Sequence, residues 1–241
     1  MNNLERPLFE DEWLIAFDKP AGLLVAPDRW DSNPHNMVQM VRERTSPACF
    51  NLHGLDREAS GAVLFAKAKA PLKTAKSSSV SDRITTEYTA IVRGTPPSDD
   101  DGFVDFLIAA DPHWPGRMRT LSSHGTPAET RYHVVERWRG FALLNVIPVT
   151  NVMHQIRVHL AEIGAPIIAD ATYGDGFGLA LSEIKPKYKR KDVAEKPLLS
   201  TLALHSSKLS FDHPATGAPS VITSDLPDKF EIALKYLRRF A

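Results

Sequence analysis

Short apolar runs bounded by turn residues recur along the chain and predict strands more often than helices. The clearest run, residues 62–66, begins after Gly61 and contains small, branched and aromatic side chains, which is typical of a buried strand. Residues 13–17 form another apolar run, which ends at a turn containing Pro20 and Gly22. The same pattern predicts further strands at residues 23–25, 87–92, 128–136, 141–149 and 198–211, of which the third and fourth form a hairpin.

Helical spacing of apolar residues occurs in only a few places. Ile156, Leu160 and Ile163 lie on one helical face, and Gly164 followed by Pro166 ends the pattern. Two more helices are predicted where apolar residues repeat with helical spacing, after Pro34 (Met37, Val38 and Val41) and near the C-terminus (Phe230, Ala233, Leu234 and Leu237). The remaining segments are a weaker helix candidate at residues 68–80 and a polar segment without a predicted element at residues 113–127.

Strands dominate the middle of the chain, and the helices are inserted singly without a strand–helix–strand rhythm. This arrangement favours an α+β fold in which helices flank a mixed, largely antiparallel sheet. The 241 residues show no internal repeat and no linker between two cores, and a chain of this length can bury a substantial core. We therefore expect a single domain over residues 1–241.

Composition and charge narrow the class of protein. The formal net charge is zero, whereas nonspecific nucleic-acid binders are usually basic, so local cations would have to hold a nucleic-acid partner. Cys49 is the only cysteine, which excludes an intrachain disulfide and favours a reducing compartment. The first residues lack the apolar core of a signal peptide, and no apolar stretch approaches the ~20 residues that span a bilayer. We expect a cytoplasmic protein without a membrane partner.

Two segments could supply local cations for an RNA backbone. Residues 185–196 combine lysines and arginines with Tyr188, a mixture that suits phosphates and bases. Arg117 and Arg119, on the polar segment, form a second candidate. A solvated charged loop is the alternative interpretation of both segments. The expected phosphate contacts are Lys187, Lys189, Arg190, Lys191, Arg117 and Arg119.

The polar stretch ahead of the strand at residues 62–66 contains the main candidate for chemistry, Asp56. A carboxylate at this position is either a turn former or a reactive group at the edge of a pocket. A metal site is not indicated, because His154 and His159 would point about 140° apart on the predicted helix. A single cysteine also cannot provide a set of thiolate ligands.

Four stretches carry a pattern that becomes specific when they are considered together and in this order. They are residues 18–22 (Asp-Lys-Pro-Ala-Gly), residues 53–67 with His53, Asp56 and Ser60-Gly61, residues 87–94 (Glu-Tyr-Thr-Ala-Ile-Val-Arg-Gly) and residues 154–160 (His-Gln-Ile-Arg-Val-His-Leu), followed by Gly164, Pro166, Asp170, Tyr173 and Gly174. Residues 204–205 and 213–217 match a closing strand and turn. The set resembles the RluA-type pseudouridine synthases, which isomerise uridine to pseudouridine in structured RNA.

The resemblance implies a catalytic domain with a curved mixed sheet and no separate N-terminal RNA-binding domain. It implies that Asp56 is the catalytic carboxylate, which attacks either the base or the sugar, and that Arg157 pairs with it. Tyr88 would stack on the target base and assist proton removal from carbon-5. The isomerisation involves no redox step, so we expect no metal and no organic cofactor. The substrate-binding residues that we expect are His53, His154, Gln155, Ile156 and Leu204.

The sequence departs from the family at several positions. Gly54 stands where the family has an arginine, Ala59 where it has a threonine and Thr86 where it has a lysine. Residues 151–153 replace the family's Gly-Arg-Thr. The main hypothesis is therefore a monomeric enzyme that isomerises uridine in ribosomal or transfer RNA with a different grip on its substrate. The alternatives are a catalytically weakened or inactive RNA-binding relative and a protein-interaction module built on the same scaffold.

Overall fold

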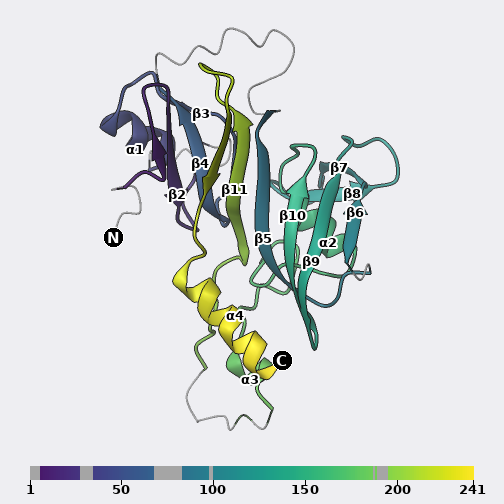
Figure 1. Ribbon diagram of the computed structural model, residues 1–241. Helices are drawn as coiled ribbons and strands as arrows, with labels where there is room; N and C mark the ends of the chain where they lie inside the picture. The colour runs from purple at the N-terminus through teal and green to yellow at the C-terminus, as the bar shows by residue number, and fades with distance from the viewer. Residues whose placement is uncertain (1–5, 28–34, 68–82, 98–99, 187, 189–194) are drawn as a thin grey trace. The chain divides into compact units, whose positions relative to one another are not determined.

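The computed structural model describes residues 6–27, 35–67, 83–97, 100–186, 188 and 195–241 (Figure 1). The chain forms two compact units. Unit 1 comprises Met1–Glu87 and His205–Asp225, and unit 2 comprises Tyr88–Leu204 and Leu226–Ala241. This division neither confirms nor contradicts the expectation of a single domain, which stays a prediction. No described helix is both long enough and apolar enough to cross a membrane.

Unit 1 is built around two adjacent buried strands, β2 (Leu14–Lys19) and β4 (Ser60–Ala66), which pair antiparallel. The short strand β1 (Phe9–Glu10) extends the sheet beside β2, and β3 (Phe50–Asn51) pairs with β4. On its other side β4 pairs in parallel with β11 (Leu204–Asp212), which forms an antiparallel hairpin with β12 (Pro219–Thr223). Helix α1 (Met37–Arg44) is the one helix among the described residues of unit 1.

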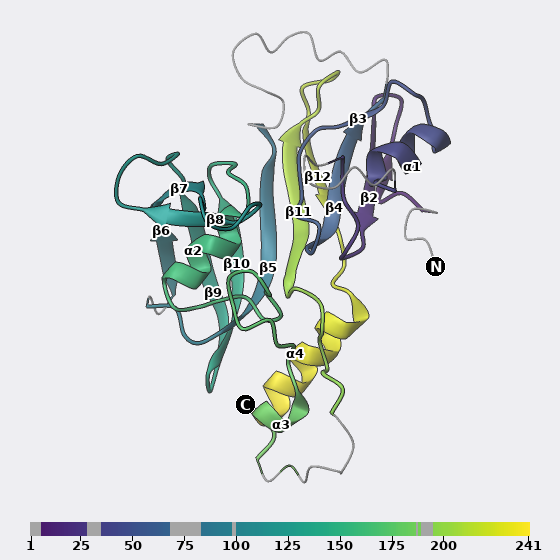
Figure 2. The ribbon, with the colours of Figure 1, turned by 180° about the vertical axis from the view of Figure 1, so that it is seen from behind.

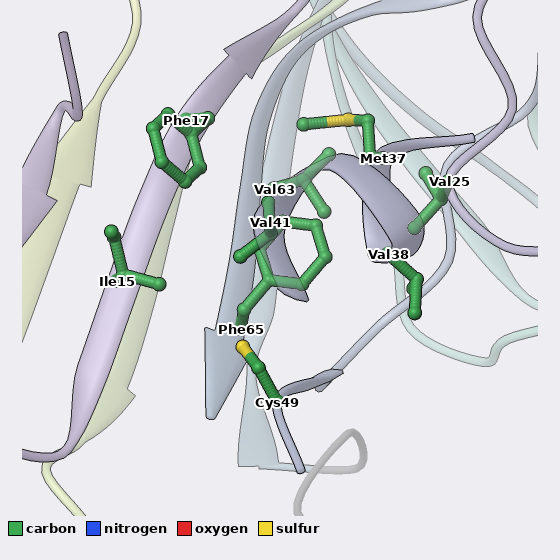
Figure 3. Packing of buried hydrophobic residues seen from close by; sticks show 9 residues of the cluster. All are labelled: Ile15, Phe17, Val25, Met37, Val38, Val41, Cys49, Val63 and Phe65. Carbon is green, nitrogen blue, oxygen red and sulfur yellow. The ribbon is translucent and has the colours of Figure 1, made fainter. Parts of the chain in front are cut away.

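Both faces of β2 and β4 are covered, which explains why their sequences are apolar without alternation. On one face, Ile15 and Phe17 of β2 and Val63 and Phe65 of β4 pack with Val41 and other residues of α1 (Figure 3). The Phe17 and Phe65 rings meet edge to face with their centroids 6.4 Å apart. The opposite face is buried against the β11–β12 hairpin by the cluster Leu14, Ala16, Ala62, Leu64, Ala66, Leu209, Phe211 and Ile222.

The candidate strand at residues 23–25 is wrong, because these residues serve as the entry to α1 rather than as part of the ladder. The carbonyl of Leu24 accepts a hydrogen bond from the Met37 amide, and the carbonyl of Val25 accepts one from the Val38 amide, each at 2.9 Å. Leu24 forms only an isolated bridge with Asn36. Val25 is buried and Leu23 and Leu24 are partly buried, while the backbone of this run satisfies N–H groups of the first helical turn.

Unit 2 contains an antiparallel sheet in the order β5 (Thr85–Arg93), β10 (Phe141–Pro148), β9 (Thr130–Trp138) and β6 (Asp101–Val104). A separate hairpin consists of β7 (Leu107–Ala110) and β8 (Met118–Leu121). Helix α2 (Gln155–Glu162) lies against β8, β9 and β10 (Figure 2). Helix α4 (Asp228–Phe240) packs on the short α3 (Leu181–Ile184).

Strand register assigns side chains to the two faces of the unit 2 sheet. Tyr88 is opposite Val146, which is in turn opposite Tyr132, so these side chains share a face. Thr130 lies two residues from Tyr132 and has the same orientation. Its hydroxyl is bonded to Gln155 Nε2 (3.1 Å) and His159 Nδ1 (3.0 Å) of α2. Tyr88 therefore projects from the face that α2 covers.

The remaining sequence predictions for elements are mostly confirmed. The strands at residues 13–17, 62–66 and 87–92, the hairpin at residues 128–149 and three helices are present. The strand predicted from residue 198 begins only at Leu204, and the polar segment at residues 113–127 contains β8. The helix candidate at residues 68–80 lies outside the described residues, as do Lys187, Lys189, Arg190 and Lys191.

Candidate active site

The loop that carries Asp56 is fixed to the rest of unit 1 through its backbone. The Ala59 amide donates to the carbonyl of Asp56 at 3.2 Å and closes a tight turn just ahead of β4. The next carbonyl, that of Arg57, accepts from the Gly22 amide (2.7 Å) and from Lys19 Nζ (3.0 Å). The half-buried Asp56 side chain is thus presented by a loop whose backbone has little freedom.

Lys19, from the Asp-Lys-Pro-Ala-Gly stretch, tethers the Asp56 loop to the core strand β2 of unit 1. Its side chain is fully buried, and Nζ donates to the carbonyls of Pro20 (3.1 Å), Leu23 (2.7 Å) and Arg57 (3.0 Å). Burial lowers the pKa of Lys19 to about 7, and the negative charges of Asp56, Glu58 and Asp18 oppose that shift. Lys19 therefore joins the first motif to the Asp56 loop and adds a buried titratable cation near the carboxylate.

A second anchor holds the strand that follows the loop. His205 Nε2 donates to the Ser224 carbonyl (3.3 Å), so Nδ1 is the acceptor for the Ser60 hydroxyl at 2.9 Å. Burial lowers the pKa of His205 and keeps the ring neutral, which preserves this tautomer. A Cβ on the neighbouring Gly61 would lie 2.3 Å from the Ser206 carbonyl oxygen, so only glycine permits this approach of β4 to β11.

His53 is likewise held by the backbone of unit 1. Its Nε2 accepts from the Leu64 amide at 3.1 Å, and its Nδ1 donates to the Gly54 carbonyl at 3.1 Å. Burial lowers the pKa of His53 to about 4, so the ring is neutral at physiological pH. Both ring nitrogens thus connect the loop before Asp56 to β4, and the substrate-binding role expected for His53 stays a prediction.

Arg157 is buried in unit 2 and has a fixed carboxylate partner. Its Nε and Nη2 donate to Asp170 Oδ2 (2.8 Å) and Oδ1 (2.9 Å), and Nη2 also donates to the Thr172 hydroxyl (3.2 Å). Burial alone would raise the pKa of the Asp170 carboxyl, but the hydrogen bonds and charge of Arg157 outweigh it and hold that pKa below its usual range. The guanidinium orientation is therefore set by a bidentate ion pair.

Two residues of the Arg157 segment have clear structural partners. Gln155 Oε1 accepts from the Thr150 hydroxyl (2.8 Å) and the Val152 amide (3.1 Å), and its Nε2 donates to the Glu129 carbonyl (2.8 Å). These bonds fix the turn that leads into α2. His154 Nδ1 lies 2.8 Å from the Tyr173 hydroxyl. The substrate contacts expected of Gln155 and His154 stay predictions.

The apolar candidates are buried, as are most of the aromatic atoms of Tyr88. Ile156 is 6% exposed, Leu204 2% and Tyr88 8%. Of the expected phosphate contacts within the described residues, Arg119 is exposed on β8 and Arg117 precedes that strand. Asp56 lies in unit 1, whereas Arg157 and Tyr88 lie in unit 2, so the convergence of these three side chains stays a prediction. Within unit 2, Tyr88 shares the sheet face on which α2 packs.

The sequence did not indicate the contacts that Lys19, Asp170 and Tyr173 make at the candidate site. Each of these residues lies in one of the motifs that resemble the family, so the sequence already marked its position. What the motifs did not indicate was the pairing, because Asp170 and Tyr173 approach Arg157 only through the loop that follows α2.

Comparison with known proteins identifies the family. Residues 13–162 match the family model described as RNA pseudouridylate synthase. The chain is 31% identical over 217 residues to the Dual-specificity RNA pseudouridine synthase RluA of Vibrio vulnificus, covering 86% of this chain and 77% of that protein. It is 32% identical over 234 residues to the Ribosomal large subunit pseudouridine synthase C of Pasteurella multocida, covering 96% and 67%.

Solved structures agree with the fold. Human RNA Pseudouridylate Synthase Domain Containing 4 is matched with a TM-score of 0.69 and 21% identity over 98% of this chain and 94% of that one. Human RNA Pseudouridylate Synthase Domain Containing 1 is matched with a TM-score of 0.66 and 21% identity over 94% and 86%. The α+β fold with a mixed, largely antiparallel sheet is thereby confirmed. The chain belongs to the RNA pseudouridylate synthase family and is an isomerase that converts uridine to pseudouridine in RNA.

Proposed function

We propose that Asp56 is the catalytic carboxylate of this isomerase, that Arg157 pairs with it during the reaction, and that Tyr88 stacks on the target uracil. The observation that carries the proposal is the buried bidentate pair of Arg157 with Asp170, which gives the guanidinium one orientation. The bonds from Lys19 and Gly22 to the Arg57 carbonyl support it, because they restrict the loop from which Asp56 projects. Preorganised charges of this kind lower a reaction barrier without reorganising when the substrate reacts.

The chemistry assigned to these residues conserves the atoms of the uridine. The bond between the ribose C1′ and N1 of uracil breaks, the base turns, and C1′ bonds to C5. C5 loses its proton and N1 gains one, so no oxidant or reductant takes part. The Asp56 carboxylate attacks either the base or the ribose, and the Arg157 guanidinium would orient it through charge-assisted hydrogen bonds. Access to the glycosidic bond requires the uridine to be flipped out of its stack.

The substrate that we propose is a ribosomal or transfer RNA in the cytoplasm, and the enzyme acts as a monomer without a cofactor. The relatives support ribosomal RNA, since one of them is named for the large ribosomal subunit, and another is named for dual specificity towards RNA. The proposed substrate pocket contains His53, His154, Gln155, Ile156 and Leu204. Arg117 and Arg119, together with the lysines and arginine at positions 187 and 189–191, are the proposed phosphate contacts.

The second candidate function is RNA binding without catalysis. The departures of this chain from its family favour it, since Gly54 leaves an exposed loop position without any side chain where relatives have an arginine. A protein that binds RNA and leaves every uridine unchanged would have this function.

The test compares Asp56→Ala with Glu12→Gln, which removes an exposed carboxylate from the same unit. Cellular RNA from cells with and without the protein is mapped for pseudouridine, and each purified variant is then assayed on the RNA that contains the mapped site. We expect Asp56→Ala to make no product while its affinity for RNA stays within about twofold, and Glu12→Gln to match the wild type. Product formation by Asp56→Ala would overturn the assignment. Binding by the wild type without product on any cellular RNA would establish the second function instead.

A further inference from the structure

Tyr173 lies between the candidate catalytic arginine and a second arginine. Its ring centroid is 5.3 Å from Cζ of Arg157 and 5.7 Å from Cζ of Arg117. Both distances are within the range of favourable cation–π interactions. The two guanidinium groups come from different elements of unit 2, since Arg157 is on α2 and Arg117 directly precedes β8. One aromatic ring therefore contacts both cations.

The Tyr173 hydroxyl connects the same two elements. It accepts a hydrogen bond from the Met118 amide of β8 at 2.8 Å and lies 2.8 Å from Nδ1 of His154, the N-cap residue of α2. His154 has a left-handed backbone with φ of 57°, which is unfavourable for a residue with a side chain. The Tyr173 hydroxyl thus ties the β7–β8 hairpin to the left-handed entry of the helix that bears Arg157.

Tyr173 also acts on Arg157 through its backbone. The Tyr173 amide donates to Asp170 Oδ1 at 3.1 Å, and that same oxygen accepts from Arg157 Nη2. A movement of Tyr173 would therefore displace the carboxylate that orients the guanidinium. Tyr173 therefore influences Arg157 in three ways: its ring contacts the guanidinium, its hydroxyl binds the entry of α2, and its amide binds the Asp170 carboxylate.

Arg117 is placed to receive an anion at the other end of this network. Its Nε is buried but donates no hydrogen bond to any residue that the structure describes, although 43% of the side chain is exposed. Its ion-pair partner, Asp111 Oδ2, is 4.0 Å from Nε, which is too long for a hydrogen bond. Because Nε itself is shielded from solvent, an RNA phosphate would bind the exposed part of the Arg117 side chain, where it would gain a charge-assisted bond.

We propose that Tyr173 is a positioning residue that couples a phosphate-binding subsite at Arg117 to the orientation of the Arg157 guanidinium. The phosphate belongs to the RNA backbone of the substrate. Its binding fixes Arg117 and the β7–β8 hairpin, and the Tyr173 ring and hydroxyl transmit that restraint to Arg157. The inference rests on the proposed role of Arg157 and goes beyond it, because it states how binding of the RNA backbone prepares that residue.

A second tether of the hairpin provides the control. The Thr120 hydroxyl of β8 donates to Glu162 Oε2 at the far end of α2, at 2.7 Å. Thr120→Val loosens the hairpin from α2 without changing a contact of Arg157. Tyr173→Phe keeps the ring and the amide but removes the hydroxyl that bonds Met118 and His154. The two variants separate a specific coupling from a general loss of hairpin packing.

The kinetic experiment measures RNA affinity and the single-turnover rate separately. For Tyr173→Phe we expect affinity within about twofold of the wild type and a rate reduced between about tenfold and a hundredfold, the effect of a misplaced catalytic group. Arg117→Ala should weaken RNA binding and also lower the rate at saturating RNA. In the double variant, Tyr173→Phe with Arg117→Ala, the fold-loss in rate should be clearly smaller than the product of the two single fold-losses. The reason is that both substitutions interrupt the same coupling to Arg157. Thr120→Val should keep the wild-type rate.

A second readout does not depend on product. The Nε–H resonance of Arg157 is followed in protein labelled with ¹⁵N-arginine and is assigned by its loss in Arg157→Lys. Addition of an RNA stem-loop with uridines in its loop should slow the exchange of this proton with water in the wild type and in Thr120→Val. It should not do so in Tyr173→Phe or in Arg117→Ala.

The proposed coupling is overturned if RNA slows the exchange of the Arg157 Nε proton in Tyr173→Phe as much as it does in the wild type. It is also overturned by a rate loss in Thr120→Val equal to that in Tyr173→Phe, or by fully multiplicative losses in the double variant. A failure of the proposed function would look different, since it would be product formation by Asp56→Ala while the response of the Arg157 proton to RNA persists.

Discussion

The guanidinium of Arg157 and the carboxylate of Asp170 form a bidentate ion pair at 2.8 Å and 2.9 Å, with side chains only 2% and 1% exposed. Two charges withdrawn from water this completely are stable only together, because each is costly to bury alone. The two residues lie 13 positions apart, on opposite sides of the turn that begins at Gly164. The loop after α2 is therefore as much a part of the candidate site as the helix itself.

Asp170→Asn tests this pair. The amide keeps the shape of the carboxylate but leaves the buried Arg157 without its counter-charge, so we expect unfolding to become easier by about 3–5 kcal/mol. The measurement is chemical denaturation of the variant and of Glu136→Gln, which breaks the exposed pair of Glu136 with Arg238 in the same unit. That control should cost no more than about 1 kcal/mol. Equal effects of the two substitutions would show that the Asp170 pair contributes no more than a surface pair.

The Arg157 site shows what sequence could and could not predict. The apolar spacing of residues 156–163 and the stop at Gly164 gave the helix and its end, because these depend on local chemistry. The partner of Arg157 within its own unit was not predictable, since it depends on how the following loop returns. The β7–β8 hairpin was missed for a related reason. Its strands have four residues each, too few to show alternation, and its polar connection resembles a loop.

Residues 23–25 show the opposite error, an apolar pattern that predicted too much. The side chains of Leu23 and Val25 pack against or in the core of unit 1, as expected, but the carbonyls of this segment have other partners. Leu23 accepts from Lys19 Nζ, and the next two carbonyls accept from the first amides of α1. Burial could be deduced from the residue types, whereas the hydrogen-bonding partners were decided by tertiary structure.

Lys19→Met should destabilise the protein through the Asp56 loop. Methionine fills a similar volume but leaves the carbonyls of Pro20, Leu23 and Arg57 without the Nζ donor. The Arg57 carbonyl keeps its bond from the Gly22 amide, so the loss falls mainly on the carbonyls of Pro20 and Leu23. An acceptor left unpaired away from water costs about 1–3 kcal/mol, and we expect the free energy of unfolding to fall by about that amount. Denaturation measures this loss, and the single-turnover rate at a temperature where the variant is folded should fall as well.

The matched control for Lys19 is Lys208→Met, which removes a half-exposed lysine paired with Glu87 in the same unit. It should change stability by no more than about 1 kcal/mol. If the variant at Lys19 were as stable and as active as this control, the three carbonyl bonds would have no role in holding the loop.

Gly61→Ala tests the close approach of β4 to β11. The backbone has φ of +116°, and the new Cβ would meet the nitrogen and oxygen of Ser206 at 2.5 Å and 2.3 Å. Gly217→Ala in the same unit is the control, since its φ is +71° but no atom lies within 4 Å of the new Cβ. The control should cost about 1–2 kcal/mol for the left-handed backbone alone. Gly61→Ala should cost clearly more in the same denaturation experiment, and equal costs would refute the steric argument.

The buried histidines should make the protein less stable in mild acid. His53 has a pKa of about 4 in the folded protein, lowered by burial, against 6.5 when unfolded. The unfolded chain therefore binds the proton more readily, and stability falls as the pH drops from about 6.5 towards 4. Between pH 7 and pH 5, protonation of His53 alone should lower the free energy of unfolding by about 2 kcal/mol. The pKa values of His159 and His205 are lowered as well, so these residues act in the same direction.

His53→Gln isolates the contribution of that one ring. Glutamine cannot be protonated but can still accept from the Leu64 amide and donate to the Gly54 carbonyl, the two bonds that the histidine makes. Denaturation of both proteins at pH 7 and pH 5 gives the loss of stability on acidification. The loss should be smaller in the variant by about 2 kcal/mol, even if the variant is less stable at both pH values. An unchanged loss would mean that His53 is protonated in the folded protein at pH 5, which its burial and its acceptance of the Leu64 amide both oppose.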